Sequence, residues 1–426
     1  MPRFARVLIG IALVIGVALA ILWLQRKPIA DSFVRDELRK RGVPARYRIA
    51  DLGLSTQRLE DVVIGDPAHP DLVADWVEVH TDLSFSGAKV TGISAGHVRI
   101  RGALQNGTLS LGAIDKLMPP PSGKPFSLPS LNVRVADARM HLETPYGVAG
   151  LKLSGEGRLD DGFHGTLAAV SPRMAVGECT AERLAAVLKI AVSDQRPAIE
   201  GPLRASMARC AGVALTRPGA QLDVTLNEAF DRWQGKADID LDAVAATQAR
   251  AQAVKGSVTF SGGAKTTQGT LELTSGAFAS AMLSGKGAQI DGRYRAGSAG
   301  NGFTGSIAAT GAALPRAMLA RAGALKETAP GTPVAPLLAK LGDALIRAGR
   351  SADISAELTV DSQAKGGLIR VQRAMLHSAS GADVTLSGGE GVRYRWPDGA
   401  MTLDGRIGMA GGGLPDAAIS LSQRAP

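Results

Sequence analysis

Apolar and polar residues alternate with a period of two along most of the chain after Tyr47. The alternation is clearest in short segments such as Leu222–Leu226 and Leu271–Leu273. Successive side chains of a β-strand point to opposite faces of the sheet, so this period collects apolar side chains on one face and polar side chains on the other. Turn-forming pairs such as Asp161-Gly162 separate the segments. The sequence therefore predicts a mainly β fold: a long antiparallel sheet of successive hairpins with one apolar and one hydrated face.

Two segments interrupt the alternation. The first, Ala181–Ile190, predicts a short helix near the first cysteine. The second, residues 315–350, predicts a helical insertion with a net charge of +4, since it contains six Lys or Arg and two acids. One face of this insertion carries Leu337, Leu338, Leu341 and Leu345. A basic amphipathic helix can pack on an apolar sheet face or lie on a membrane, and we favour packing on the sheet.

The N-terminus carries the longest apolar run of the chain. Val7–Leu24 contains 18 consecutive residues without a charge, after Arg3 and Arg6. At 1.5 Å per residue this run comes close to the roughly 30 Å of a bilayer core. Ala18-Leu19-Ala20 resembles a signal-peptide cleavage site, but the apolar run continues beyond it. We favour a single-pass anchor over residues 1–27, and both alternatives export the rest of the chain.

The remaining chain divides at changes of pattern. Residues 28–46 predict a juxtamembrane helix and linker, with Gly42 ending the helix. Residues 47–314 predict the elongated β body, 315–350 the helical insertion, and 351–426 further strands of the same kind.

The two cysteines bear on the redox compartment of the chain, and its net charge bears on the kind of molecule that it binds. Cys179 and Cys210 can form one disulfide in an oxidising compartment, or they can be two buried free thiols. The net charge of +9 suits an anionic partner. Nucleic-acid binding usually needs clustered Lys and Arg or stacking aromatics, whereas here the cations are scattered and aromatics are 4% of residues. Phospholipid headgroups are the favoured anion, and a mildly basic hydrated surface is the alternative.

Catalytic and metal-binding motifs are not convincing in this sequence. Gly92–Gly96 matches G-x-S-x-G, but a strand-like segment follows it where a nucleophile elbow needs a helix. Asp238, Asp240 and Asp242 lack the Gly and Glu that complete a calcium loop, and their spacing suits the polar face of a strand. The six histidines have no common ligand spacing. We predict no enzyme activity, no metal and no cofactor.

Six segments carry a resemblance to a known family. They are Arg41–Tyr47, Leu59–Pro67, Pro70–Leu72, Ala74–Val79, Gly107–Gly112 and Pro121–Pro125. Together with the N-terminal apolar run, they resemble the N-terminal part of YdbH-family proteins from alphaproteobacteria of sphingomonad type. This family belongs to the AsmA-like group that includes TamB and YhdP. Family members are usually much longer, so we expect this chain to be an N-terminal portion.

The resemblance implies a location, a shape and a cargo. It implies an inner-membrane anchor, a periplasmic body, and a sheet curled lengthwise into a groove with an apolar lining. Such a groove would shield phospholipid acyl chains on the way to the outer membrane, with no active-site residues. Each CH₂ kept from water is worth about 0.8 kcal/mol. The implied partners are phospholipids, the inner membrane, and a small outer-membrane lipoprotein or another envelope protein.

Two hypotheses follow for the body. In the first, a lipid-transfer protein lines its groove with inward-facing residues of four strands, namely Val133, Val135, Leu151, Leu153, Leu222, Val224, Leu271 and Leu273. In the second, a membrane-anchored scaffold for outer-membrane biogenesis has a filled core and binds protein partners at a sheet edge. Alternation alone does not separate them, because both need one apolar face.

Overall fold

The computed structural model describes residues 35–36, 38–53, 55–84, 87–105, 108–117, 127–327 and 330–422. The expected anchor over residues 1–27 and the Asn106-Gly107 turn lie outside these residues. The longest helix in the described part has 14 residues, and no helix there has the length and apolar character to cross a bilayer. Most of the expected helix over residues 28–40 also lies outside, but its end is described. Gly42 takes a positive φ of 64°, and the amides of Gly42 and Val43 donate to the carbonyls of Arg39 and Leu38, which is the expected glycine C-cap.

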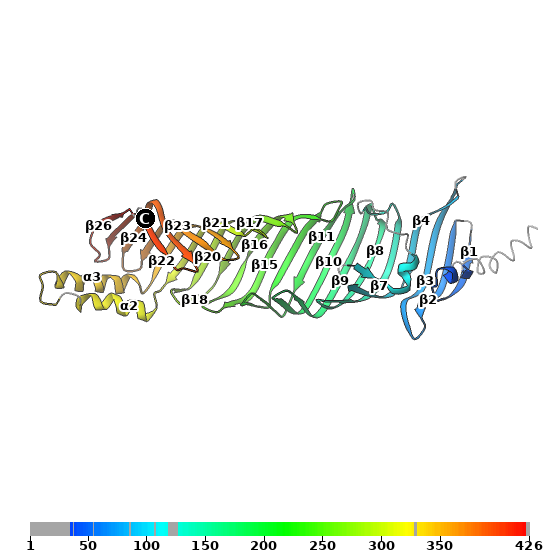
Figure 1. The fold of residues 1–426 in the computed structure, drawn as a ribbon, viewed down its shortest axis with the longest axis horizontal. Coiled ribbons are helices and arrows are strands. Elements are labelled where there is room, and N and C mark those ends of the chain that lie inside the picture. The colour runs from blue at the N-terminus through cyan, green and yellow to red at the C-terminus, as the bar shows by residue number, and fades with distance from the viewer. Residues whose placement is uncertain are drawn as a thin grey trace, which may run out of the picture. The chain divides into compact units, whose positions relative to one another are not determined.

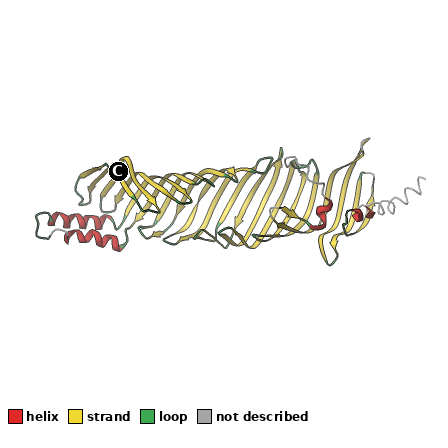
Figure 2. Cartoon of the chain, viewed as in Figure 1, coloured by secondary structure: helices red, strands yellow, loops and turns green. Residues whose placement is uncertain are grey.

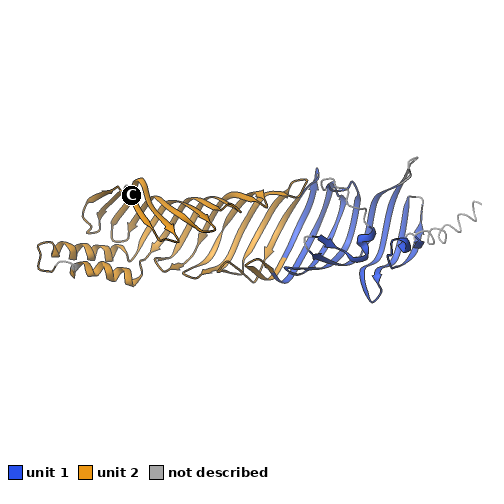
Figure 3. Ribbon diagram, viewed as in Figure 1, with its two compact units in different colours: residues 1–174, 186–197 blue, residues 175–185, 198–426 orange. Residues whose placement is uncertain are grey.

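The prediction of a mainly β chain of antiparallel hairpins is confirmed (Figures 1 and 2). The chain forms two compact units (Figure 3). Unit 1 comprises residues 1–174 and 186–197, and unit 2 comprises residues 175–185 and 198–426.

Unit 1 is a sheet with one short 3₁₀ helix, η1 (Gly112–Leu117). Its strands are β1 (Ala45–Leu52), β2 (Thr56–Asp66), β3 (His69–Ser84), β4 (Gly87–Gly96), β5 (Arg99–Gln105), β6 (Thr108–Ser110), β7 (Asn132–Thr144), β8 (Gly147–Arg158), β9 (Asp161–Val176) and the second half of β10 (Cys179–Ser193).

The order of strands in unit 1 departs from a pure meander. β3 pairs with both β4 and β5, which act as one interrupted strand. β7 pairs with the other side of β4 and β5, and both of these pairings are parallel. The prediction of an entirely antiparallel sheet is therefore wrong here. The physical reason is the length of the segment between Gln105 and Asn132. Parallel neighbours need a crossover connection of about a dozen or more residues, and this segment is long enough to provide one.

In unit 2, the first hairpin after β11 has short strands, and most later hairpins have long ones. Its strands after β10 are β11 (Arg196–Arg204), β12 (Met207–Cys210), β13 (Val213–Thr216), β14 (Gly219–Leu226), β15 (Arg232–Ala246), β16 (Ala249–Gly263), β17 (Thr266–Ser275), β18 (Phe278–Ser280), β19 (Ser284–Gly285), β20 (Gly287–Gly297), β21 (Asn301–Ala312), β22 (Ala352–Gln363), β23 (Gly366–Ser378), β24 (Ala382–Trp396), β25 (Met401–Gly411) and β26 (Ala417–Leu421). These strands pair with one another in antiparallel fashion.

Two helices and a 3₁₀ turn stand between β21 and β22. They are α2 (Arg316–Gly323), η2 (Ala324–Glu327) and α3 (Ala335–Ala348), and Figure 1 shows α2 and α3 side by side. Gly342 is buried where a Cβ would meet the carbonyl oxygen of Ala322, so glycine lets the two helices approach closely. Ala344 and Ala348 of α3 pack with Ala382 and Leu414. The C-terminal half of α3 therefore packs on the sheet, which is the favoured of the two alternatives for this segment.

The helix predicted over Ala181–Ile190 is wrong, because these residues belong to β10. Exposed Arg183 and Lys189 alternate with buried Ala186 and half-buried Leu188. The segment is rich in alanine and leucine, which favour helices by a few tenths of a kcal/mol per residue. Pairing with neighbouring strands, including Thr180 opposite Arg209, outweighs this weak preference.

Candidate functional site

Strand register in unit 2 builds two unbroken apolar rows across the sheet. Row A crosses eleven neighbouring strands, from β11 to β25, through directly opposed residues. Its members are Gly201, Leu222, Ala237, Val258, Leu271, Gly292, Gly305, Leu358, Val371, Val392 and Leu403. No polar side chain interrupts this row.

Row B lies on the same face, two residues from row A in the strands from β11 to β22 and three to six residues from it in β23, β24 and β25, where the register shifts. It extends one strand further, to β26. Its members are Leu203, Ala220, Ile239, Gly256, Leu273, Ile290, Ile307, Ala356, Ala374, Leu386, Ile407 and Ile419. Most members of both rows are only half-buried, and Ile290 is 38% exposed. The apolar side chains of unit 2 therefore form a surface that water can reach, which we call the apolar face of unit 2, rather than a closed core.

The opposite face of the same strands is polar. One row there runs through Gln221, Asp238, Ser257, Glu272, Asp291, Ser306, Glu357 and Arg373. Ion pairs link neighbouring strands across this face, such as Arg373 with Glu357 at 3.1 Å and Lys255 with Asp240 at 3.4 Å. The two faces of unit 2 thus differ completely in chemistry.

Unit 1 has the same arrangement. Row C crosses β1, β2, β3, β4, β7, β8 and β9 through Ile49, Leu59, Val77, Ala95, Val135, Gly155 and Gly165. Row D passes through β5 in place of β4 and consists of Ala45, Ile64, Leu72, Ile100, Met140, Leu151 and Ala169. These rows define the apolar face of unit 1.

A line of strand irregularities lies between rows C and D. Asp61, His97 and Asp137 have positive φ angles of 52°, 52° and 59°. In β7 the register shifts between Val135 and Ala138. An extra residue in a strand would place every following side chain on the opposite face of the sheet. A β-bulge accommodates the extra residue and so prevents this change. Val135 and Ala138 are therefore both kept on the apolar face although they are three residues apart.

Glycines mark a bend in five adjacent strands of unit 2. A Cβ at any of them would collide with a carbonyl oxygen of the neighbouring strand; they are Gly235, Gly256, Gly269, Gly292 and Gly305. Glycine inside a strand commonly marks a tight bend where another backbone comes close. Such bends let a sheet curve over its own face.

The apolar face of unit 2 also carries aromatic rings. Tyr294 lies opposite Phe303, and its hydroxyl donates to the carbonyl of Thr259 at 3.1 Å. Partial burial raises the pKa of the Tyr294 hydroxyl above its ordinary value of 10.0. Rows A to D contain no carboxylate, imidazole or amine. These rows can therefore hold apolar chains.

All eight residues expected to line a groove lie on these apolar faces. Leu222 and Leu271 belong to row A, Leu273 to row B, Val135 to row C and Leu151 to row D. The others stand beside those rows: Val133 opposite Gly157, Leu153 opposite Leu167, and Val224 opposite Gly235. Sequence reasoning missed the glycines of the rows, although their position in the two-residue period marks them as members.

The two cysteines are bonded in the structure. Cys179 begins β10 and Cys210 ends β12, and their Cα atoms are 4.0 Å apart. Both cysteines belong to unit 2, and the bond closes a loop with a sequence separation of 31 residues. A loop of this length corresponds to roughly 3 to 4 kcal/mol of stabilisation in the chain-entropy account.

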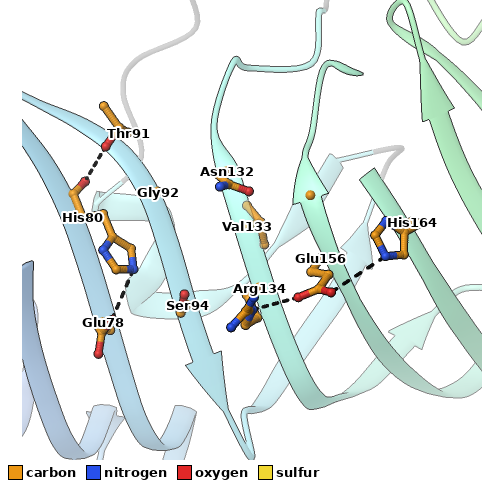
Figure 4. A pocket seen from close by; sticks show the side chains of 11 residues that line it. Glu78, His80, Thr91, Gly92, Ser94, Asn132, Val133, Arg134, Glu156 and His164 are labelled. Carbon is orange, nitrogen blue, oxygen red and sulfur yellow. Dashed lines mark hydrogen bonds and ion pairs between the residues drawn. The ribbon is translucent and has the colours of Figure 1, made fainter. Parts of the chain in front are cut away.

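The motifs considered for catalysis lie on the polar faces. Ser94 of the G-x-S-x-G motif is inside β4, and strand β5 follows where a nucleophile elbow needs a helix. It faces a hollow of about 610 Å³ with Glu78 and Arg134 (Figure 4). In that hollow Arg134 pairs with Glu156 at 2.8 Å. These charges are ordinary cross-strand pairs of a hydrated surface.

The aspartates considered for calcium pair with cations. Asp238 pairs with Lys236 at 2.9 Å, and Asp242 pairs with Arg217. Among the residues that the structure describes, no group of three or more His, Cys, Asp or Glu side chains is placed to hold a metal ion.

Comparison with known proteins identifies one family. The model of the YdbH-like family, described as "Intermembrane phospholipid transport protein YdbH", matches residues 13–412. No curated protein and no solved structure matches the chain.

Proposed function

The chain belongs to the YdbH-like family, and from this premise we propose that it carries phospholipids between the inner and outer membranes by holding their acyl chains on its apolar faces. It does so as an inner-membrane-anchored periplasmic protein, with the apolar run Val7–Leu24 as the anchor. It needs no catalytic group and no cofactor.

Row A carries this proposal. Eleven strands at about 4.8 Å spacing give an apolar path of roughly 48 Å within unit 2. One leaflet of a bilayer core is about 15 Å thick, so this path is some three times the depth of one acyl layer. A lipid can therefore slide along unit 2 without exposing its chains at a polar step.

The energetics favour a surface of this kind. An acyl chain of about 16 carbons costs on the order of 10 kcal/mol to place in water. Contact with half-exposed Leu, Ile and Val side chains removes much of that cost, because the acyl chain and the protein surface beneath it are both removed from water. The bends at Gly235, Gly256, Gly269, Gly292 and Gly305 support a sheet curled around the lipid, with the apolar face as the groove lining.

Site-specific photo-crosslinking tests the proposal. A photoreactive residue is placed at Leu222, Leu271 or Leu153, and the full chain is expressed in a Gram-negative host. We expect covalent phospholipid adducts at these positions. Matched controls on the same strands are Asp223, Glu272 and Ser154, which face the polar side and lie outside the cationic hollow described below. Equal lipid labelling of both sets, or no lipid labelling at all, contradicts the proposal.

The alternative is a membrane-anchored scaffold that acts through protein partners. It predicts protein adducts at the outer edge of β26, which pairs with no second strand among the described residues, and no lipid adducts on row A. The same crosslinking set therefore separates the two functions.

A further inference from the structure

The polar face of unit 1 contains a hollow of about 710 Å³ lined by cations from three neighbouring strands. Arg99 and Arg101 come from β5, Arg139 and His141 from β7, and Lys152 from β8. All five alternate with members of row D, which places them on the opposite side of the sheet. The hollow is therefore lined by cations of the polar face together with Ile100, Met140 and Leu151, the row D members of the same three strands.

Register sets like charges directly against one another in this hollow. Arg99 lies opposite Arg139, and Arg139 lies opposite Lys152. In the next row Arg101 lies opposite His141. Like charges directly opposite across a sheet are destabilising, so three cations in line are a cost to folding unless an anion joins them.

The acids of the region compensate only part of this charge. Asp137 pairs with Arg139 and with Lys152, each at 3.1 Å. In the described part of the chain, Arg99 and Arg101 have no ion pair. Asp71 of β3 accepts a hydrogen bond from the amide of Ala113 at 2.9 Å instead. Glu143 lies 3.7 Å from the ring of His141. The four permanent cations of the hollow therefore share the single carboxylate of Asp137.

Apolar groups complete the lining. Val170 is 58% exposed, and Val73 and Ala168 lie beside the cations in the same hollow. Val73 is opposite Arg99, and Ala168 is opposite Lys152. A ligand that combines an anion with apolar carbon atoms would use both kinds of group, whereas a small inorganic anion would use only the cations.

We propose that this cationic hollow binds the phosphate headgroup of an anionic phospholipid, with the glycerol and first acyl carbons against Val170. Arginine guanidiniums bind phosphate oxygens in pairs with charge-assisted hydrogen bonds. The proposal rests on the proposed function only for the class of ligand. Acyl-chain crosslinks on row A can succeed while headgroup binding here fails, so the two are separable.

Binding of a short-chain lipid tests the proposal. Dihexanoyl-phosphatidylglycerol is titrated into the purified full chain and followed by calorimetry, beside dihexanoyl-phosphatidylcholine and inorganic phosphate. We expect the anionic lipid to bind at least tenfold more tightly than either of the others. Equal affinity for phosphatidylcholine, or for inorganic phosphate, overturns the assignment to an anionic headgroup.

Three variants locate the binding. The double variant Arg99→Gln, Arg101→Gln should lose at least tenfold in affinity, because each charged hydrogen bond is worth more than the 1.4 kcal/mol of a factor of ten. Asp137→Asn should bind more tightly, which a folding defect would not produce. The control Lys236→Gln, Lys255→Gln removes two cations from the polar face of unit 2 and should leave affinity unchanged. Unchanged affinity in the double arginine variant overturns the proposal.

Discussion

Asp137 shows how one residue serves both faces of the sheet. Asp137 has a positive φ and lies in the bulge that accommodates the extra residue of β7. Because of this bulge, Val135 and Met140 both stay on the apolar face. Its carboxylate lies between Arg139 and Lys152 on the polar face. Hydrogen bonds from Arg139 and Lys152 hold the pKa of Asp137 below its usual value of 3.8.

Replacing Asp137 should destabilise unit 1 in a pH-dependent way. Because the pKa of Asp137 is lower in the folded state, its contribution is fully present above pH 3.8 and is lost as pH falls through the folded pKa. Asp137→Asn keeps a residue that tolerates positive φ. We expect the variant to melt below the wild type at pH 7. The difference should shrink as pH falls below 3.8 in parallel thermal melts, and a difference that stays constant down to pH 3 would refute this.

At the scale of the strand, two of the three glycines of β21, Gly302 and Gly305, have different surroundings. A Cβ at Gly305 would collide with the carbonyl oxygen of Asp291 and come within 2.6 Å of the Cα of Gly292. A Cβ at Gly302 would meet its nearest atom, a carboxylate oxygen of Asp361, at 3.6 Å. Only Gly305 is therefore required by the close approach of neighbouring backbone.

Alanine substitutions in β21 should separate the two glycines. Gly305→Ala forces the backbones of β20 and β21 apart and should cost about 1–3 kcal/mol, as overpacking does. Gly302→Ala, three residues away in the same strand, should change the free energy of unfolding by less than about 0.5 kcal/mol. Chemical denaturation measures both. Equal effects would mean that the bend at Gly305 does not depend on the missing side chain.

Strand β10 shows where local preference misleads. Its residues Ala185, Ala186 and Leu188 favour a helix when considered alone. The alternation of Arg183, Val187 and Lys189 with buried positions is the better guide, because neighbouring strands complete the hydrogen bonds of β10. Helix α3 differs, since its leucines recur at helical spacing and it packs on apolar residues of the sheet.

For the molecule as a whole, each unit combines a hydrated face with an apolar face that has little of its own to cover it. In unit 2, α3 covers Val384 and Met409 near the end of the sheet, whereas most of rows A and B remain half-exposed. A soluble chain seldom leaves so much contiguous apolar surface without a partner. The proposed partner is the acyl chain of a phospholipid.

A charge in the middle of row A should block transport without unfolding the chain. Leu271→Glu places a carboxylate between Val258 and Gly292, where a passing acyl chain must desolvate it. Transfer of a fluorescent phospholipid between donor and acceptor vesicles should fall about tenfold or more, which corresponds to 1.4 kcal/mol or more. Thr274→Glu adds the same charge to the polar face of β17 and should leave the rate unchanged. Equal rates for the two variants would argue against passage along row A.

Much of the fold and of the candidate site could be predicted from alternation alone. The side on which each residue lies depends only on the geometry of a single strand, so Leu222, Leu271 and the other six expected residues could be assigned to an apolar face. The YdbH-like family could also be predicted from short segments such as Leu59–Pro67, because family membership is a property of residue order.

Three features required the tertiary structure, because each depends on which strands are neighbours. Parallel pairing of β7 with β4 and β5 follows a connection whose path no local pattern specifies. The continuity of rows A and B depends on register between residues up to 53 positions apart in sequence, as for Gly305 and Leu358. The cationic hollow exists because Arg99, Arg139 and Lys152, scattered in the sequence, meet across three strands. The sequence by itself thus determined the two faces and the family, and pairing in space decided which residues share a row, since register is a relation between strands.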